Sequence, residues 1–411
     1  MRARRRIAAL TAVLLTAVLL TGIPAAAEGR VLYDEESGIA LQELLREDDT
    51  AWPVSATPSA GLDIKAKGAV LMDQASGTVL YEKDARTHLP IASVTKVMTL
   101  LLVMEAIGEG RLSLDEPVTC SERAASMGGS QIWLEPGETM TVRDLVKAAA
   151  VVSANDACAA LAEHICGTVE AFVAAMNARA AALGMEDTLF KDCSGLDDTG
   201  YSCARDVAVM SRQLMTHPEI REYTTIWMDT LRDGKSQLVN TNKLVRHYKG
   251  ATGLKTGTTN ASGHCLAATA EREGTAFVAV VLGCATTADR FGGARAMLDY
   301  GFSAYVSYAP GEEARQTAPI PVLRGQAESV PVAVDLPDAV LLKKGTEKQV
   351  QTVWELAEDL EAPVTAGQVV GTWRLQVGEE TVGEYTVRAA QNVPRMNFRY
   401  AYSLLAAALL Q

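Results

Sequence analysis

The fold of this chain is decided around the stretch Ile91-Ala92-Ser93-Val94-Thr95-Lys96-Val97-Met98-Thr99-Leu100, which begins a long apolar run. Ser93 and Lys96 are three residues apart, so a helix would place them on one face. A serine hydroxyl is a weak nucleophile until a neighbouring base takes its proton. A lysine can be that base when it is neutral, and burial beside other cations lowers its pKa toward that state. The pair alone also fits an N-cap serine followed by a surface lysine, because so short a motif recurs by chance.

Two further motifs follow in order. Val151-Val152-Ser153-Ala154-Asn155-Asp156-Ala157 places a serine and an amide two residues apart where a helix is expected to start. Gly250-Ala251-Thr252-Gly253-Leu254-Lys255-Thr256-Gly257-Thr258-Thr259 places a second cation on an expected strand, and Gly257 leaves room for a close backbone approach. Taken singly, Ser153 fits a helix cap and Lys255 a surface charge. Together with Ser93 and Lys96, the ordered set predicts one site assembled from three distant segments.

This ordered set resembles the active-site serine enzymes that recognise penicillin, whose signatures are S-x-x-K, S-D-N and K-T-G. More narrowly, the chain is similar to the D-alanyl-D-alanine carboxypeptidases of the low-molecular-mass penicillin-binding class. The similarity covers about residues 65–305 well and extends to other segments of this chain, namely Gly129-Ser130…Pro136-Gly137, Asn155-Asp156-Ala157-Cys158, Gly195-Leu196-Asp197 and Ala261-Ser262-Gly263-His264. One departure is Ala154 in the middle of the second motif, where Asp or Gly is commoner; a residue as small as alanine should be tolerated.

The resemblance implies a role for each matching residue. Ser93 would be the nucleophile, Lys96 its base, and Ser153 the relay that carries the proton to the leaving amine. Asn155 would hydrogen-bond the substrate amide and Lys96. On the strand, Lys255 with the hydroxyls of Thr256 and Thr258 would bind the terminal carboxylate of the substrate, Lys255 would help to keep Lys96 neutral, and Gly257 would admit the substrate. The backbone amides of Ser93 and Thr258 would form the oxyanion hole.

The implied reaction removes the terminal D-alanine from peptidoglycan stem pentapeptides through an acyl-enzyme on Ser93. β-Lactams, which carry a strained amide and a carboxylate, should acylate the same serine and leave slowly. The chemistry needs no metal and no cofactor. The expected partners are wall peptides ending in D-Ala-D-Ala, β-lactams as covalent inhibitors and the outer face of the cell membrane, but no nucleic acid.

Three alternatives stay open. A class A-like β-lactamase shares the first and third motifs, but its deacylating glutamate, usually in Glu-x-x-x-Asn, is absent between Ser153 and Lys255. A non-catalytic protein that binds β-lactams or wall peptides would not need the intact set of Ser93, Lys96, Ser153 and Lys255. Transpeptidase or endopeptidase activity would keep the same chemistry and change the acceptor or the bond attacked, because the shape of the groove selects both.

The N-terminal segment predicts export. Residues 1–27 combine four arginines, an apolar stretch from Ile7 to Ile23 and the cleavage sequence Pro24-Ala25-Ala26-Ala27, which together are typical of a signal peptide; an uncleaved membrane anchor is the alternative. Net charge is −12, and losing the segment's arginines would make the chain more acidic still. An acidic chain is a poor match for nucleic acid or for an anionic lipid surface.

We interpret most of the cysteines as small buried hydrophobic residues. Their number is odd, seven, and there is no C-x-x-C pair. Cys193 and Cys203 flank a loop and are the best candidates for a disulfide. Because the five histidines do not cluster with the cysteines at ligand spacing, a metal site is not predicted.

Hydrophobic patterns predict an α+β catalytic domain over 65–308, after a leader segment at 28–64. Strands are expected near both ends of this domain, at 67–73, 78–82, 265–270 and 276–283, with helices between them and at 288–304. The distant strands should pair into one antiparallel sheet with flanking helices and a helical insert. The resemblance implies that this is a β-lactamase/transpeptidase-like fold. Alternating Val/Ile-rich stretches then predict a small all-β domain over 315–390. Residues 393–411 predict a short amphipathic helix that anchors the chain to a membrane; packing of this helix on the protein itself is the alternative.

Overall fold

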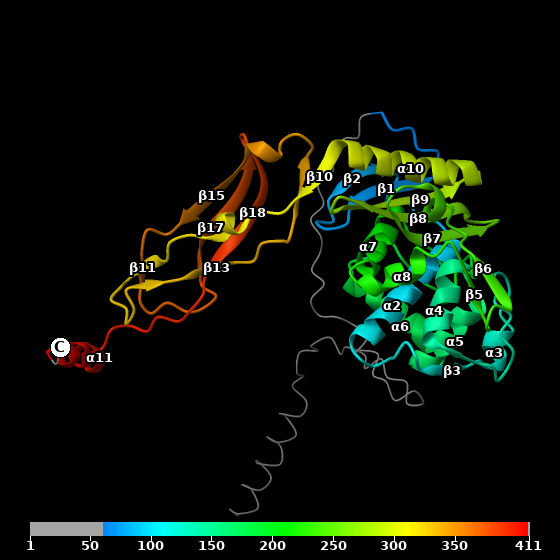
Figure 1. The fold of residues 1–411 in the computed structure, drawn as a ribbon, viewed down its shortest axis with the longest axis horizontal. Coiled ribbons are helices and arrows are strands. Elements are labelled where there is room, and N and C mark those ends of the chain that lie inside the picture. The colour runs from blue at the N-terminus through cyan, green and yellow to red at the C-terminus, as the bar shows by residue number, and fades with distance from the viewer. Residues whose placement is uncertain (1–60, 410–411) are drawn as a thin grey trace, which may run out of the picture.

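The computed structural model describes residues 61–409. The predicted signal peptide (1–27) and nearly all of the predicted leader (28–64) lie outside these described residues. The described chain divides into a first unit, residues 61–304, a second unit, residues 305–393, and a terminal helix (Figure 1).

The first unit is built on a five-stranded antiparallel sheet in the order β2-β1-β9-β8-β7. Its strands are β1 (Gly68–Asp73), β2 (Val79–Lys83), β7 (Ala251–Thr259), β8 (Gly263–Arg272) and β9 (Thr275–Cys284). Strands β1 and β9 come from opposite ends of the unit and pair along six residues, from Gly68↔Leu282 to Asp73↔Phe277. The predicted joining of distant strands into one sheet is thereby confirmed.

Everything between β2 and β7 forms the predicted helical insert. Its helices are α2 (Lys96–Gly108), α3 (Glu122–Ala125), α4 (Val142–Val151), α5 (Asn155–Cys166), α6 (Val169–Ala182), α7 (Ala204–Leu214), α8 (Arg221–Thr224) and α9 (Leu244–His247), with 3-10 turns η2 (Ala92–Thr95) and η3 (Pro218–Ile220). Two short hairpins complete it: β3 (Pro117–Thr119) with β4 (Thr139–Thr141), and β5 (Met228–Leu231) with β6 (Ser236–Val239).

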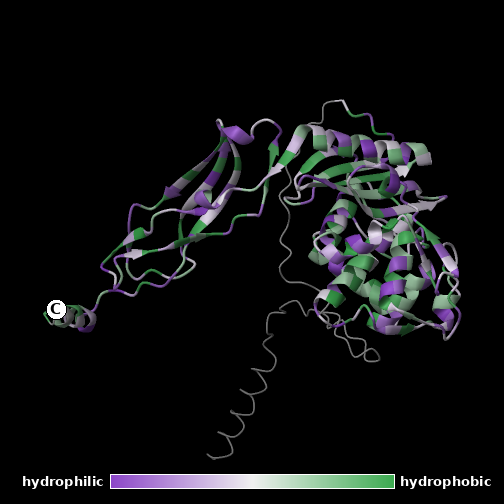
Figure 2. Ribbon diagram, viewed as in Figure 1, coloured by the Kyte–Doolittle hydropathy of each residue, from purple (hydrophilic) through white to green (hydrophobic). Residues whose placement is uncertain are grey.

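Both faces of the central sheet are covered, which explains its sequence. Helix α10 (Thr287–Ala304) lies on one face and the helical insert on the other (Figure 1). The middle of β9 is buried without interruption from Phe277 to Leu282, and these strands are mostly hydrophobic in Figure 2. A strand that is buried on both faces carries a continuous apolar run rather than an alternating one. The larger core lies on the insert side, around the almost wholly buried helix α2.

The second unit is made of short strands around a smaller apolar core. Its elements are β10 (Tyr305–Tyr308), β11 (Ile320–Leu323), β12 (Ser329–Val330), β13 (Val332–Val334), β14 (Val340–Lys343), β15 (Val350–Leu356), β16 (Leu360–Glu361), β17 (Val369–Val377) and β18 (Glu380–Ala389), with 3-10 turns η4 (Glu312–Arg315) and η5 (Glu347–Gln349). Trp373 is fully buried in the core, and its indole N–H donates to Ala314 O at 2.8 Å. Strand β10 directly follows α10 and pairs with β14, so this ladder connects the two units.

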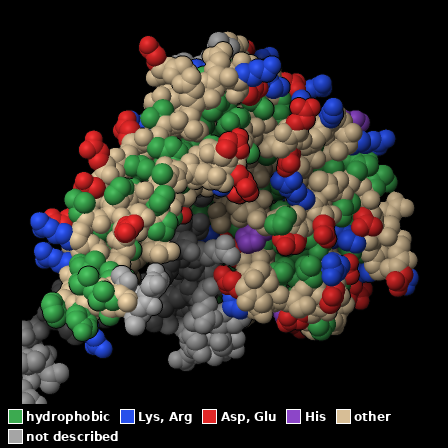
Figure 3. Space-filling model, turned by 60° about the vertical axis from the view of Figure 1, so that its left-hand side comes forward, with side chains coloured by type: hydrophobic (Ala, Val, Ile, Leu, Met, Phe, Trp, Pro, Cys, Tyr) green, Lys and Arg blue, Asp and Glu red, His purple; other side chains and the backbone are tan. Residues whose placement is uncertain are grey.

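Helix α11 (Phe398–Leu409) follows the second unit and protrudes from it (Figure 1). Figure 3 brings this end of the molecule forward and shows hydrophobic side chains gathered there. Among the described residues, no single helix has the length and apolar character to cross a membrane. Helices α5 and α6 meet that test only as a pair, bent by 85°, and both pack in the core of the first unit.

The predicted Cys193–Cys203 disulfide is wrong, because all seven cysteines are buried free thiols. Cys203 instead caps helix α7, since its Sγ accepts a hydrogen bond from Asp206 N at 3.4 Å. Burial raises the pKa of the Cys203 thiol to about 12, so this sulfur stays protonated at neutral pH.

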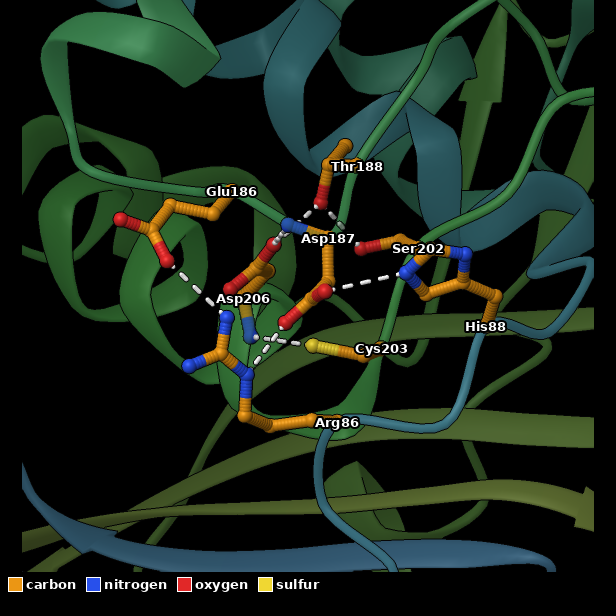
Figure 4. Close-up of polar contacts among 8 residues, drawn as sticks. All are labelled: Arg86, His88, Glu186, Asp187, Thr188, Ser202, Cys203 and Asp206. Carbon is orange, nitrogen blue, oxygen red and sulfur yellow. Dashed lines mark hydrogen bonds and ion pairs between the residues drawn. The ribbon is translucent and has the colours of Figure 1, made fainter.

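A polar network fixes the loop that leads into α7 (Figure 4). Asp187 accepts one hydrogen bond from Arg86 Nε at 2.6 Å and lies 3.0 Å from His88 Nε2. Asp206 accepts hydrogen bonds from Asp187 N and Thr188 Oγ1. The ligand-type atoms of Asp187, Cys203 and Asp206 lie within 4.8 Å of one another. Because these groups hydrogen-bond to protein donors, we describe the cluster as an anchor that ties the loop after α6 to the segment before η2.

Candidate active site

Ser93 and Lys96 lie together at the junction of η2 and α2, as their spacing predicts. Ser93 belongs to the 3-10 turn, and the α-helix proper begins at Lys96. Lys96 Nζ lies 2.8 Å from Ser93 Oγ and donates to Ser194 O at 2.6 Å. A neutral amine can keep an N–H for Ser194 and offer its lone pair to the serine hydroxyl.

The environment of Lys96 favours that neutral form. Its side chain is completely buried, and the loss of hydration lowers the pKa of the ammonium group. The negative charges of Asp192 and Asp156 oppose this effect without cancelling it. The site therefore contains a hydroxyl in hydrogen-bond contact with an amine whose proton is weakly held.

The second motif lies at the start of α5. Ser153 has a left-handed backbone (φ 65°), its side chain is buried, and its Oγ has no hydrogen-bond partner among the described residues. A strained, buried and unpartnered hydroxyl is costly in a fold and is typical of a functional site. Ala154, not Ser153, occupies the N-cap position of α5, so a capping role for Ser153 is excluded.

Asn155 differs in one contact from the expectation. Its Nδ2 donates to Gly128 O at 2.6 Å, and its buried Oδ1 has no partner in the described structure. The expected hydrogen bond between Asn155 and Lys96 is not formed; the Lys96 amine bonds to Ser93 and Ser194 instead. The free Oδ1 is left as an acceptor for an incoming N–H donor.

Strand β7 supplies the third wall with a second buried amine. Lys255 is 1% exposed, and its Nζ donates to Thr256 O at 3.0 Å. Burial holds the pKa of Lys255 well below its usual value, and whenever nearby Lys96 is protonated its charge lowers that pKa further. An arriving carboxylate would favour the charged form again, so the strand edge is suited to an anion.

The absence of a side chain at Gly257 brings β7 against η2. A Cβ atom at this position would lie 2.6 Å from Ile91 O and 3.1 Å from Ser93 N. Any larger residue would push the strand away from the serine. The backbone of Ser93 and that of the β7 edge are thus held side by side, which is the arrangement that a two-amide oxyanion hole requires.

Arg290 is a further cation of this wall that the sequence reasoning missed. It lies in the first turn of α10, and its Nη1 donates to Thr258 Oγ1 at 3.0 Å and to Gly257 O at 3.3 Å. Its position 32 residues after Thr258, on a helix covering the opposite face of the sheet, gives no local signal in the sequence. Only the packing of α10 on the sheet reveals it.

Two models of known protein families match the chain in sequence. The sequence model described as "D-alanyl-D-alanine carboxypeptidase" matches residues 54–286, and the model described as "Penicillin-binding protein 5, C-terminal domain" matches residues 302–395. The chain is 39% identical over 325 residues to the D-alanyl-D-alanine carboxypeptidase DacF of Bacillus subtilis, an alignment that spans 78% of this chain and 84% of that relative. The chain belongs to the D-alanyl-D-alanine carboxypeptidase family.

Other relatives of this carboxypeptidase include DacC of Escherichia coli, 32% identical over 78% of this chain and 82% of its own length. Among solved structures, penicillin-binding protein 5 of Haemophilus influenzae has a TM-score of 0.75 at 29% identity, and the match covers 83% of this chain and all of that one. Penicillin-binding protein D2 of Listeria monocytogenes, solved with ampicillin bound, has a TM-score of 0.54 at 34% identity over 59% of this chain and 100% of its own. The family fold thus covers both units of the carboxypeptidase.

Proposed function

We propose that Ser93 is the nucleophile and Lys96 the base of this serine-type D-Ala-D-Ala carboxypeptidase. The observation that carries the proposal is the 2.8 Å contact between Ser93 Oγ and the amine of a fully buried lysine. Burial lowers the pKa of Lys96, so a larger share of this lysine is neutral and able to take the hydroxyl proton.

The other residues of the site follow from the position of the substrate. Its terminal carboxylate would bind at β7, where Lys255 provides charge and Thr256 and Thr258 provide hydroxyls; Gly257 keeps this strand close to η2. Arg290 adds a second positive charge through Thr258. The carbonyl of the penultimate D-alanine would then lie over Ser93. Asn155 Oδ1, which is buried and has no partner among the described residues, would accept a hydrogen bond from the substrate amide.

The reaction proceeds in two steps, acylation of Ser93 and hydrolysis of the acyl-enzyme. In the first, Ser93 Oγ bonds to the carbonyl carbon, its proton passes to Lys96, and the amides of Ser93 and Thr258 stabilise the oxyanion. The C–N bond breaks, and the proton reaches the leaving D-alanine amine through Ser153, whose Oγ is otherwise unpartnered. In the second, water attacks the ester, the peptide leaves with its new carboxylate, and a proton returns to Ser93.

Release of D-alanine tests this assignment. The chain without residues 1–27 is incubated with a pentapeptide ending in D-Ala-D-Ala, and free D-alanine is quantified for the wild type and Ser93→Ala. We expect release by the wild type and none above background by the variant. A fluorescent penicillin should label the wild type covalently and not the variant. Equal release from both proteins would refute the role of Ser93.

We also propose that the enzyme is exported and that α11 attaches it to the outer face of the membrane. Phe398 and Leu409, at the two ends of α11, are each 86% exposed, and Leu405 is 64% exposed. A helix this short can lie in the interface but is too short to span the bilayer. Cosedimentation with lipid vesicles tests the attachment: the full chain should sediment with them, and a chain ending at 393 should stay in solution. Equal sedimentation would refute a role for α11.

A further inference from the structure

Trp133 is the most exposed large hydrophobic side chain of the first unit. It is 78% exposed and has a left-handed backbone (φ 53°), which is rare for a bulky residue. Exposing an indole and straining its backbone both cost free energy. Such a combination persists where the side chain has a contact to make, so we asked what holds Trp133 in place and what lies beside it.

The exposed position of Trp133 is imposed by the residues around it. The amides of its two neighbours, Ile132 and Leu134, both donate to the buried carboxylate of Asp156, at 3.1 and 3.0 Å. On the other side, Arg232 donates to Ile132 O at 2.9 Å and to Trp133 O at 3.3 Å. With the amides on both sides and the carbonyl held, the backbone of Trp133 is fixed, and its side chain lies exposed to solvent.

The loop that carries Trp133 is part of the wall of the active site. Its Gly128 and Ser130 carbonyls accept hydrogen bonds from Asn155 Nδ2 and Asn155 N, at 2.6 and 2.7 Å. Asp156, which holds the loop around Trp133, is the residue after Asn155. The indole is therefore connected to the proposed substrate-binding amide through two adjacent residues of α5.

A second exposed apolar residue, Leu196, lies on the neighbouring loop, which is also held by a carboxylate that accepts hydrogen bonds from backbone amides. Asp192 accepts hydrogen bonds from the consecutive amides of residues 194–197, two of them at 2.6 Å, so the loop is rigid where Leu196, 43% exposed, leaves it. Ser194 of this loop accepts the hydrogen bond from Lys96. The two loops touch, since a Cβ atom at Gly129 would lie 3.2 Å from Leu196 Cδ2.

We propose that Trp133 and Leu196 determine specificity by binding the aliphatic part of the wall peptide that precedes D-Ala-D-Ala. The inference rests on the proposed function, because the substrate carboxylate is placed at β7. The rest of the peptide must then leave the site past the loops that hold Asn155 and Lys96, and these loops carry the two exposed apolar side chains. Contact with the peptide would bury both side chains and discriminate longer substrates from shorter ones.

The test compares two substrates, the stem pentapeptide and N-acetyl-D-Ala-D-Ala, which lacks the preceding residues. The measured quantity is the ratio of their kcat/KM values. We expect Trp133→Ala to lower this ratio about tenfold, the effect of losing one apolar contact, mainly through a higher KM for the pentapeptide. Leu196→Ala should lower it less, and Trp133→Phe should retain most of it. Val369→Ala, which truncates an exposed apolar residue of the second unit, is the matched control and should leave the ratio unchanged.

Each other result overturns the proposal. An equal loss on both substrates would mean that Trp133 only supports the loop, and an unchanged ratio would mean that it makes no contact. A loss seen only when the glycan is attached to the peptide would assign Trp133 to sugar rather than to peptide. Labelling of Trp133→Ala by a fluorescent penicillin shows independently that Ser93 still reacts, which separates failure of this inference from failure of the proposed function.

Discussion

The two units of the enzyme treat charge in opposite ways. The first unit buries lysines, acids and arginines, among them Lys96, Lys255, Asp156 and the Glu105–Arg179 pair. Among the described residues that follow Arg290 in the chain, none with a charged side chain is buried. The second unit is organised around an apolar core that contains the fully buried Trp373. Burying a charge costs stability unless it is compensated. Lys96 and Lys255 carry this cost at the proposed active site, whereas Glu105 and Arg179 compensate each other as an ion pair. The comparison indicates that the first unit loses folding stability by burying the lysines of the proposed active site. The described part of the second unit buries no charged side chain and does not carry this cost.

The largest contrast is expected between two lysines. Lys96→Met should lower kcat/KM for the pentapeptide by about 10³-fold, since it removes the base from the serine. Lys343→Met, in the exposed ion pair of Lys343 with Glu380, should change it by less than about twofold. Kinetics on both variants, with circular dichroism to confirm folding, measure the difference. Comparable activity of Lys96→Met and the wild type would break the comparison.

Two arginines extend the contrast to stability. Arg179→Met breaks the fully buried ion pair between Arg179 and Glu105 and should lower the free energy of unfolding by about 3–5 kcal/mol. Arg374→Met removes the contacts of Arg374 with Glu355 and Glu384 on the surface of the second unit and should cost about 1 kcal/mol or less. Urea unfolding measures both. The double variant Glu105→Gln/Arg179→Met should recover part of the lost free energy of unfolding. No recovery would show that the charge of Glu105 is not the cause of the destabilisation.

The pH profile sharpens the description of the two buried amines. Lys96 acts when neutral, so kcat/KM should rise with pH through its lowered pKa, below the ordinary lysine value of about 10.4. Lys255 binds the carboxylate when charged, so kcat/KM should fall again as Lys255 loses its proton. A bell-shaped profile follows. Lys255→Arg should remove the alkaline limb and keep the acid one; loss of the acid limb instead would reverse the two assignments.

The smallest effect is expected from a reductant. Because all seven thiols are free and buried, dithiothreitol should leave the melting temperature unchanged. Ellman's reagent should titrate about seven thiols after unfolding in the absence of reductant. A reductant-dependent fall in melting temperature would show that a disulfide stabilises one of the units.

Local patterns in the sequence predicted the elements and the three motifs. The spacing of Ser93 and Lys96 accounts for their contact, and the alternating stretches of residues 315–390 do form strands, such as β17. The supporting contacts could not be predicted in this way. Asp156 and Asp192 hold loops by bonding to backbone amides, and any acidic residue offers the same pattern in sequence. Arg290 reaches Thr258 only through packing.

The incorrect prediction of a disulfide has the same cause as the failure to predict these supporting contacts. Cys193 and Cys203 flank a loop, and this position alone made them the best candidates for a bond. The direction of each side chain decides the matter: Cys203 Sγ turns to the first turn of α7, where it accepts the Asp206 amide. Such directions depend on tertiary structure, which a linear pattern does not encode.

The contact between Gly257 and the turn that carries Ser93 limits how the enzyme can escape antibiotics. Substitution at this glycine would displace the strand from Ile91 O, since even one methyl group would lie 2.6 Å from that oxygen. The same displacement would spoil hydrolysis of the natural peptide. Resistant variants of this enzyme should therefore arise at the outer loops, where a substitution can exclude a bulky antibiotic and still admit the narrower peptide substrate.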